Sequence, residues 1–313
     1  MAIHTILGAN GTISTELIPI LQEAGEKIRL VSRNPKKIPG AETVAADVLN
    51  REQVFEAVKG SDVVYLLVGL KYDIKVWRAS WPVIMRNVID ACAAAHAKLI
   101  FFDNVYMYGK VDGPMTESTP FNPCSKKGKV RAEIDEMLLR EMKAGKIQAI
   151  IARAADFYGP RVTDKSGVSI MIFEEMKNGR SAQCLVRVNQ PHSYTYTPDA
   201  ARGLYLLASA EHAYGQIWHL PSALPALTGK EFISIAAKYM GATDHIQVLP
   251  KWMMAILGWF MPFMKELSEM LYQYEYSYIF DSSKFEKAFP FKPTPYEDGI
   301  KETAAWFKQH DVS

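Results

Sequence analysis

Residues 4–14 read His4-Thr5-Ile6-Leu7-Gly8-Ala9-Asn10-Gly11-Thr12-Ile13-Ser14. A short apolar strand is followed by two glycines three residues apart and then by the start of a helix. Glycine permits a tight turn and lets a phosphate group approach the backbone, and the N-terminus of a helix attracts anions. The turn therefore predicts a dinucleotide site. Ser14 stands where a third glycine is usual, so a purely geometric role for the two glycines is an alternative.

The composition is that of an ordinary globular chain of 313 residues, with 49% hydrophobic and 22% charged residues. The formal net charge is +2 and no long basic or acidic run occurs, so nothing indicates nucleic acid as a partner. Cys92, Cys124 and Cys184 lie far apart and form no CxxC pair, so we expect neither a metal site nor a disulfide framework. A reducing cytoplasm is the expected location.

Membrane-directed segments are not expected from the sequence. The N-terminus begins with a strand and lacks the basic and apolar regions of a signal peptide. Residues 252–264 are apolar, but the segment is too short to span a bilayer and contains Gly258 and Pro262. We therefore expect a lid or a pocket wall there, and no membrane span.

The fold class follows from the alternation of short apolar runs with helical patterns. The predicted strands are 4–7, 27–31, 43–46, 63–68, 99–102 and 147–152, and the predicted helices between them are 16–24, 51–58, a long helix through 81–96, and 126–142. This order predicts an α/β protein with a Rossmann-type, doubly wound parallel sheet, whose ligand lies at the carboxyl ends of the strands. We expect residues 1–160 to form the NAD(P)-binding domain, with 192–220 returning to it, and 161–191 and 221–313 to form a smaller, mostly C-terminal α/β substrate-binding part and lid.

The end of the second predicted strand bears on the choice of cofactor. It reads Ser32-Arg33-Asn34-Pro35-Lys36-Lys37 and has no carboxylate. An acidic residue here usually binds the ribose 2′-hydroxyl of NAD, whereas an arginine accommodates the 2′-phosphate of NADP. Ser32 and Arg33 therefore favour NADP over NAD. A solvated, cationic loop formed by Arg33, Lys36 and Lys37 is the alternative.

Several landmarks occur together in an order that resembles the short-chain dehydrogenase/reductase superfamily, in its extended or atypical NAD(P)-binding epimerase/dehydratase branch. The resemblance covers essentially the whole chain. Its landmarks are the glycine turn at Gly8, Asp47-Val48 after the third strand, Tyr108-Gly109 after the fifth, residues 153–160 after the sixth, and residues 192–201 before a late helix.

The resemblance implies roles for the matching positions. It places Gly8, Asn10, Gly11, Thr12 and Ile13 around the diphosphate, Asp47 and Val48 near the adenine, and Val68 and Gly69 under the nicotinamide-side ribose. An ordinary turn carboxylate is an equal alternative for Asp47. Val68 is a core residue in either case.

The catalytic positions depart from the family pattern. The family carries a tyrosine, a lysine four residues later on the same helix face, and a serine or threonine after the fifth strand, so that the lysine lowers the pKa of the phenol. The resemblance matches Lys129 to the lysine, Ser125 to the tyrosine and Asn104 to the serine. An alkyl hydroxyl is far too weak an acid to replace a phenol, so standard chemistry by this triad is doubtful.

Four groups, two of them at these matched positions, are candidates for the chemistry. Lys129 could donate a proton if desolvation lowered its pKa, or could bind the ribose only; the neighbouring Lys126, Lys127 and Arg131 are interpreted as solvated helix charges. Asn104 could polarise a substrate oxygen, and Tyr106 could supply a phenol or pack as a structural residue. Asp156 could act as a base or as a capping residue.

The C-terminal third is rich in methionine and aromatic residues between 252 and 278, which indicates either helix core or an adaptable apolar pocket. Leu257, Met261 and Met264 are spaced for one helix face. We expect an NADP-dependent oxidoreductase that transfers hydride to or from a small carbonyl, enone or sugar-like substrate. A non-catalytic NADP-binding sensor and an NAD(P)-dependent epimerase/dehydratase are the alternatives. A homodimer through the long helices is expected by family resemblance only.

Overall fold

The computed structural model describes residues 1–163 and 166–310. The chain forms two compact units from interleaved segments. Unit 1 comprises 1–107, 126–153 and 200–220, and unit 2 comprises the described residues of 108–125, 154–199 and 221–313. Residues 200–220 thus belong to the first unit, whereas 192–199 belong to the second.

Unit 1 contains a seven-stranded parallel sheet in the order β11-β6-β5-β4-β1-β2-β3. The strands are β1 (Ile3–Leu7), β2 (Lys27–Ser32), β3 (Ala41–Ala45), β4 (Val63–Leu66), β5 (Lys98–Asp103), β6 (Ala149–Arg153) and β11 (Gln216–His219). The strand order reverses between β1 and β4, which is the position where open α/β sheets bind ligands. The predicted Rossmann-type sheet is confirmed.

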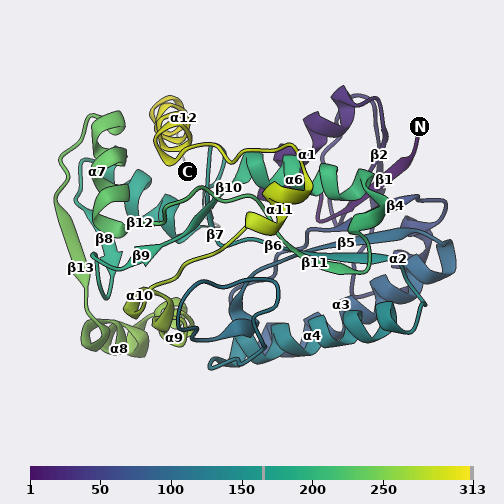
Figure 1. Cartoon of the computed structure of the whole chain (residues 1–313), viewed down its shortest axis with the longest axis horizontal. Helices are drawn as coiled ribbons and strands as arrows, with labels where there is room; N and C mark the ends of the chain where they lie inside the picture. Colours follow the sequence, from purple (N-terminus) through teal and green to yellow (C-terminus); the bar gives the residue numbers. More distant parts are fainter. Residues whose placement is uncertain (164–165, 311–313) are drawn as a thin grey trace. The chain divides into compact units, whose positions relative to one another are not determined.

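Helices cover both faces of this sheet. Figure 1 shows α3 (Ile74–Ala95) and α4 (Lys126–Lys143) on one side, and α1 (Thr12–Glu23) and α6 (Thr197–Ser209) on the other. The helix α2 (Arg51–Val58) packs beside α3. Two short helices, η1 (Tyr106–Tyr108) and η3 (Glu211–Ala213), follow β5 and α6 along the chain. Pro82 lies inside α3, which is one continuous helix. One large apolar core joins α2, α3 and α4 to the sheet.

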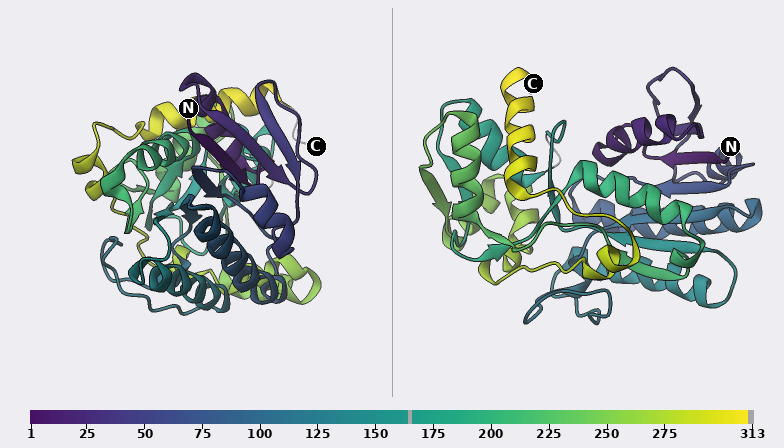
Figure 2. Two further views of the ribbon diagram at one scale, coloured as in Figure 1. Left: turned by 90° about the vertical axis from the view of Figure 1, so that its right-hand side faces the viewer. Right: turned by 45° about the horizontal axis from the view of Figure 1, so that its top comes forward.

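Unit 2 is built from short strand pairs and helices. Its pairs are β7 (Asp156–Tyr158) with β10 (Tyr194–Tyr196), β9 (Pro191–His192) with β12 (Leu227–Thr228), and β8 (Ala182–Leu185) with β13 (Ile246–Leu249). Its helices are the π-helical η2 (Ser169–Glu174), α5 (Glu175–Lys177), α7 (Gly229–Met240), α8 (Lys251–Phe260), α9 (Pro262–Ser268), α10 (Tyr272–Glu275), α11 (Ser283–Ala288) and α12 (Tyr296–Gln309). Figure 2 shows α7 and α12 side by side, where both contribute to an aromatic core.

Two local features of unit 2 concern where its helices begin. Thr228 and Glu231 form a capping box at the start of α7. The expected single helix face of Leu257, Met261 and Met264 is wrong, because the chain leaves the helical conformation at Met261 and α9 begins at Pro262. Within the part of the chain that the structure describes, no helix has both the length and the apolarity needed to cross a membrane.

Candidate functional site

The glycine turn closes the carboxyl end of β1. The Gly8 N–H donates to the Val31 carbonyl oxygen at 2.9 Å, and the Gly11 N–H donates to the Gly8 carbonyl oxygen at 3.0 Å. Gly8 has φ +99°, and a Cβ placed there would lie 2.8 Å from the backbone carbonyl carbon of Leu67. Glycine is therefore required at this position for both conformation and space.

The first turn of α1 is suited to an anion. Gly11 is the N-cap residue. Within residues 1–163 and 166–310 no side chain caps the helix, and no acidic residue occupies its first turn. The N–H groups of Thr12 and Ile13 have no acceptor within the helix, and the helix dipole adds partial positive charge at this end. Ser14 is buried and donates its hydroxyl to the Gly11 carbonyl oxygen at 2.7 Å, so a serine fits where a third glycine was missing. These residues fit a dinucleotide diphosphate.

Asn10 links the turn to the loop that follows β2. Its amide nitrogen donates to the Asn34 carbonyl oxygen at 2.8 Å and to the Ser32 hydroxyl at 3.3 Å, and its amide oxygen accepts from the Lys36 N–H at 3.3 Å. Arg33, inside this loop, is exposed. The observed role of Asn10 is thus to fix the backbone of the loop that carries Arg33.

Asp47 and Val48 lie in the loop after β3. The Asp47 carboxylate accepts the Leu49 N–H at 3.0 Å and its own N–H donates to Gln53 at 2.7 Å. The Val48 carbonyl oxygen accepts from the side chain of Asn87 at 3.1 Å. The turn-stabilising interpretation of Asp47 accounts for these contacts, and recognition of an adenine by it stays a prediction.

The segment after β4 contains Val68, Gly69 and Tyr72. A Cβ at Gly69 would meet no atom of the described residues within 4 Å, so these leave space open beside this backbone. Lys127, from the first turn of α4, is fully buried, and its Nζ lies 4.4 Å from the centroid of the Tyr72 ring. A lysine ammonium is therefore held against the loop that follows β4, within unit 1.

This position corrects the sequence interpretation of α4. Lys129 is exposed, so the expected desolvation of its ammonium is not observed. Lys127 and Arg131, interpreted as solvated, are both buried, because they share the face of Val130 and Ile134 that packs on the sheet. The helical period of this face was the signal that could have identified Lys127.

Arg131 belongs to a buried ionic network. Its guanidinium donates to Asp103 at 3.0 Å and stacks over the Trp81 ring at 4.1 Å. Arg153, which is fully buried, pairs with Asp135 and has its Nε 3.6 Å from Asp103. Breaking a buried ion pair leaves an uncompensated charge, so this network anchors α4 to the ends of β5 and β6.

Asn104 and Tyr106 follow β5. The Asn104 amide oxygen accepts the Tyr106 N–H at 3.0 Å, and the Tyr106 ring stacks on Trp77 with centroids 6.2 Å apart. Both residues are partly exposed. Ser125, at the position matched to the family tyrosine, is buried. The contacts agree with structural roles for Asn104 and Tyr106, and their catalytic roles stay predictions.

Asp156 is in unit 2, at the start of β7. Its Oδ2 accepts hydrogen bonds from the His192 Nε2 at 3.0 Å and from the Tyr274 hydroxyl at 3.2 Å. His192 and Tyr274 were not predicted as site residues. They lie 36 and 118 positions from Asp156 along the chain, so no local motif joins the three residues.

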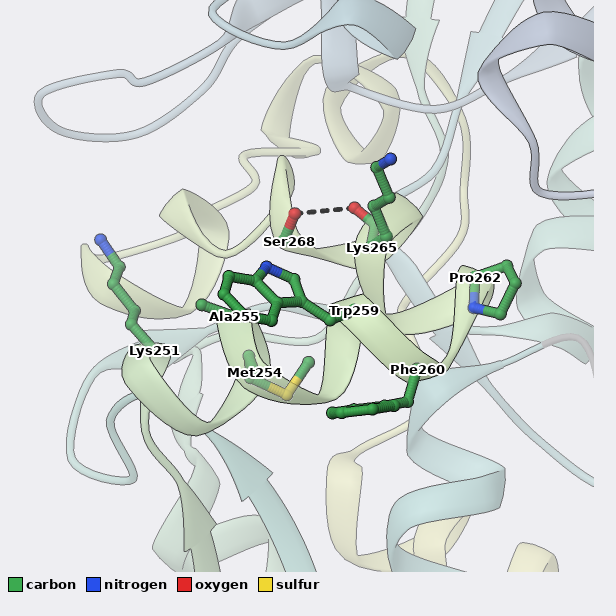
Figure 3. Close-up of a pocket in the computed structure, with 9 residues that line it drawn as sticks. Lys251, Met254, Ala255, Trp259, Phe260, Pro262, Lys265 and Ser268 are labelled. Atoms are coloured by element: carbon green, nitrogen blue, oxygen red, sulfur yellow. Dashed lines mark hydrogen bonds between the residues drawn. The ribbon is translucent and has the colours of Figure 1, made fainter.

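A groove of about 720 Å³ is lined by α8 and α9 in unit 2 (Figure 3). Met254 is buried at its base, whereas Trp259 and Phe260 are 88% and 78% exposed. In Figure 3, Lys251 and Lys265 extend away from the Trp259 indole. The helix-core interpretation of this block therefore holds for Met254 but is wrong for the two aromatic residues.

Solved structures with the same fold span nearly the whole chain. The dTDP-glucose 4,6-dehydratase of Bacillus anthracis, in complex with NAD, has a TM-score of 0.83 at 15% identity, covering 99% of this chain and 98% of that one. The UDP-glucose 4-epimerase of Thermotoga maritima, with UDP-glucose, has a TM-score of 0.82 at 17% identity, covering 98% and 99%. The UDP-glucose 4-epimerase of Thermus thermophilus, complexed with NAD, has a TM-score of 0.80 at 16% identity, covering 97% and 98%.

Sequence comparison gives a more specific result. The uncharacterized protein y4nL of Sinorhizobium fredii is 30% identical over 140 residues, which make up 44% of this chain and only 38% of that relative. The model of the NAD dependent epimerase/dehydratase family matches residues 4–219, which run from β1 to the end of β11. The chain therefore belongs to the NAD dependent epimerase/dehydratase family.

Proposed function

We propose that the protein is an NADP-dependent oxidoreductase that interconverts a carbonyl group and an alcohol on a small organic substrate. The observation that carries the proposal is the uncapped N-terminus of α1 beside the loop that presents Arg33. The helix end supports binding of a diphosphate, and Arg33, with no carboxylate in its loop, supports binding of a 2′-phosphate. A bound nicotinamide would supply or accept the hydride.

The residues of unit 1 would hold and polarise the reactants. Lys127, fully buried against Tyr72, is the lysine that we assign to holding the loop after β4 in place under the ribose, and the exposed Lys129 is the competing assignment from sequence, by direct ribose binding. Asn104 and Tyr106 each carry a polar side-chain group that could hydrogen-bond a substrate oxygen. Small carbonyl compounds, enones and sugar-like compounds are the substrate classes that we propose.

The experiment is a substrate screen in which NADPH fluorescence measures nucleotide binding and NADPH absorbance measures its oxidation. The panel contains simple ketones, enones, UDP-glucose and dTDP-glucose. The two sugar nucleotides are included because solved proteins with a similar fold are named for them or were solved with them bound. We expect saturable NADPH binding and oxidation of NADPH with at least one carbonyl compound. Absence of nucleotide binding would refute the proposal.

A second candidate is a non-catalytic, NADP-binding sensor. It is favoured by Ser125 at the tyrosine position, because a serine hydroxyl cannot act as the acid. Tight NADPH binding without turnover across the panel would support this candidate. Epimerase or dehydratase activity would instead convert UDP-glucose or dTDP-glucose without net consumption of NADPH. A homodimer stays a prediction, which sedimentation of the full chain would test.

A further inference from the structure

The helical hairpin formed by α8 and α9 in unit 2 exposes an apolar surface to which the proposed function assigns no role. Residues 259–263 are consecutive and all exposed. The bulky apolar side chains of the hairpin that are between 46% and 88% exposed are those of Trp252, Ile256, Trp259, Phe260, Met261 and Phe263. Proteins in water rarely expose a contiguous apolar patch, and such a patch marks an interaction site.

The outward face of α8 is apolar, which is unusual for a helix at the surface of a globular unit. Trp252, Ile256 and Trp259 are spaced i, i+4 and i+7, so they lie on one face of the helix. Met254, about 200° from Trp252 around the helix, is fully buried. A surface helix normally carries polar residues opposite its buried stripe. The helix α8 carries apolar residues on both faces, so its outer face is suited to a second apolar environment.

The backbone at the bend between the two helices is satisfied internally. The Met261 N–H donates to the Leu257 carbonyl oxygen at 2.8 Å, and the Met261 carbonyl oxygen accepts from the Lys265 N–H at 3.3 Å. Pro262 has no N–H to satisfy. A Cβ at Gly258 would lie 3.3 Å from the Lys265 Cα, so the absence of a side chain lets the helices approach closely. Internal satisfaction of backbone groups is the condition for contact with hydrocarbon, and Met261 and Pro262 meet it.

The exposed charges of the hairpin are positive. Within residues 251–268, all of which the structure describes, the exposed charged side chains are Lys251 and Lys265, and Glu266 is half-buried. Lys251 forms an ion pair with Glu275, so attraction of an anion depends mainly on Lys265. Lysine side chains beside an apolar surface extend their ammonium groups toward a polar boundary. The hairpin therefore combines an apolar, aromatic surface with a cationic edge.

We propose that the α8–α9 hairpin docks the protein on the surface of a bilayer that contains anionic phospholipids. The aromatic side chains enter the headgroup boundary, and Lys265 contacts lipid phosphates, so the hairpin lies on the bilayer and does not span it. A protein partner fits this surface less well, because protein interfaces include directed hydrogen bonds. The indole N–H of Trp259 is the only side-chain donor among residues 259–263. The docking does not depend on the proposed function.

The test is sedimentation of the full chain with vesicles that contain phosphatidylglycerol and phosphatidylcholine in equal parts. Phe260→Glu is expected to weaken binding to these vesicles about 10–100-fold, because burial of one phenylalanine side chain is lost. Val83→Glu is the matched control: it places the same charge at a 42% exposed apolar position of α3, outside the hairpin. This control is expected to bind as wild type does. Circular dichroism checks that both variants are folded.

Two further variants separate the electrostatic and aromatic contributions. Lys265→Gln is expected to weaken binding to the mixed vesicles about fivefold, the contribution of one lysine near an anionic surface, and to leave binding to phosphatidylcholine alone unchanged. Vesicles are expected to shift the tryptophan emission of wild type to shorter wavelength, because Trp259 is 88% exposed. Trp259→Phe is expected to reduce this shift while it continues to sediment with the vesicles.

Failure of wild type to sediment with the mixed vesicles, or equal sedimentation of Phe260→Glu and wild type, would overturn the proposal. Self-association that Phe260→Glu abolishes, without vesicle binding by wild type, would also overturn it and would assign the surface to a second copy of the chain. NADPH titration of the same preparations is a separate result. Phe260→Glu is expected to bind NADPH as wild type does, so loss of membrane docking and failure of the proposed function are distinguishable.

Discussion

Substitution of Gly11 by valine separates nucleotide binding from folding. Gly11 has φ −84° and ψ 168°, an extended conformation that valine adopts readily. A Cβ there would lie 3.2 Å from the Gly8 carbonyl oxygen and 3.6 Å from the Leu67 carbonyl oxygen. These contacts are tight but not prohibitive, so we expect a loss of about 1–3 kcal/mol in the free energy of unfolding, the usual range for overpacking.

We expect Gly11→Val to reduce the free energy of NADPH binding more than it reduces the free energy of unfolding. The valine side chain would stand where a diphosphate approaches the N–H groups of Thr12 and Ile13. A hydrogen bond to a charged group contributes about 1.5–3 kcal/mol, so blocking both donors costs about 3–6 kcal/mol. At about 1.4 kcal/mol per tenfold, Gly11→Val should raise the dissociation constant for NADPH by about 10²–10⁴-fold.

Calorimetric titration with NADPH, together with thermal unfolding followed by circular dichroism, measures both quantities. Thr15→Val is the matched control, because Thr15 is exposed on α1 one turn beyond the N-cap and valine has nearly the same shape. The control is expected to bind as wild type does. An unchanged dissociation constant in a folded Gly11→Val protein would refute the diphosphate role of this turn.

Three other predictions address the site lysine, packing and pH. Lys127→Met should weaken NADPH binding or slow turnover, whereas Lys129→Met should change neither; the reverse result in the titration and turnover assay would restore the sequence-based assignment. Gly299→Ala places a Cβ 2.5 Å from the Tyr158 hydroxyl oxygen, so urea denaturation should show a loss of about 1–3 kcal/mol in the free energy of unfolding. The double variant Gly299→Ala/Tyr158→Phe, which lacks this hydroxyl, should regain the lost stability. Equal stability of Gly299→Ala and wild type would contradict the clash. Burial raises the pKa of Tyr296 to about 12, above about 10 in the unfolded chain, so the folded chain binds more protons. The contribution of Tyr296 to the free energy of unfolding, measured as the difference between wild type and Tyr296→Phe, should fall by about 3 kcal/mol as pH rises between these values. A difference between wild type and Tyr296→Phe that stays constant across this range would contradict the burial argument.

The sequence predicted unit 1 well because its signals are local. From β1 to β5 each strand, turn and helix follows its neighbour in the chain, and α2 has the bounds 51–58 that its pattern predicted. The strand β11, which no pattern predicted, returns to the sheet after a long segment of unit 2. The glycine turn also depends on adjacent residues, so the order of residues along the chain is enough to place Gly8 and Gly11 at the end of β1. Parallel strands then bring these turns to one edge of the sheet.

The choice between Lys127 and Lys129 could not be made by motif matching alone. The two residues differ by about 200° around the helix, so a shift of two positions exchanges a buried side chain for an exposed one. The periodicity of Val130 and Ile134 indicated the buried face, but the family pattern of a lysine four residues after the tyrosine position, here Ser125, pointed to Lys129 instead.

The polar group of unit 2 was beyond the reach of sequence patterns. Asp156 could be identified because it follows a predicted strand, but its partners come from β9 and α10. Such contacts form only when distant segments pack, and no periodicity or spacing records them. The end of helix α8 at Met261 could have been predicted from the sequence, because a proline such as Pro262 at the first helical position is a common signal for the start of a new helix.

The central claim is that unit 1 binds a nicotinamide dinucleotide and prefers its 2′-phosphorylated form. Parallel titrations of wild type and Arg33→Ala with NADPH and NADH test it most directly. One charge-assisted hydrogen bond to the phosphate contributes about 1.5–3 kcal/mol, so wild type should bind NADPH about 10–100-fold more tightly than NADH. Arg33→Ala should lose most of this preference while keeping its affinity for NADH. Equal affinities in wild type would contradict the NADP assignment, and binding of neither nucleotide would contradict the claim as a whole.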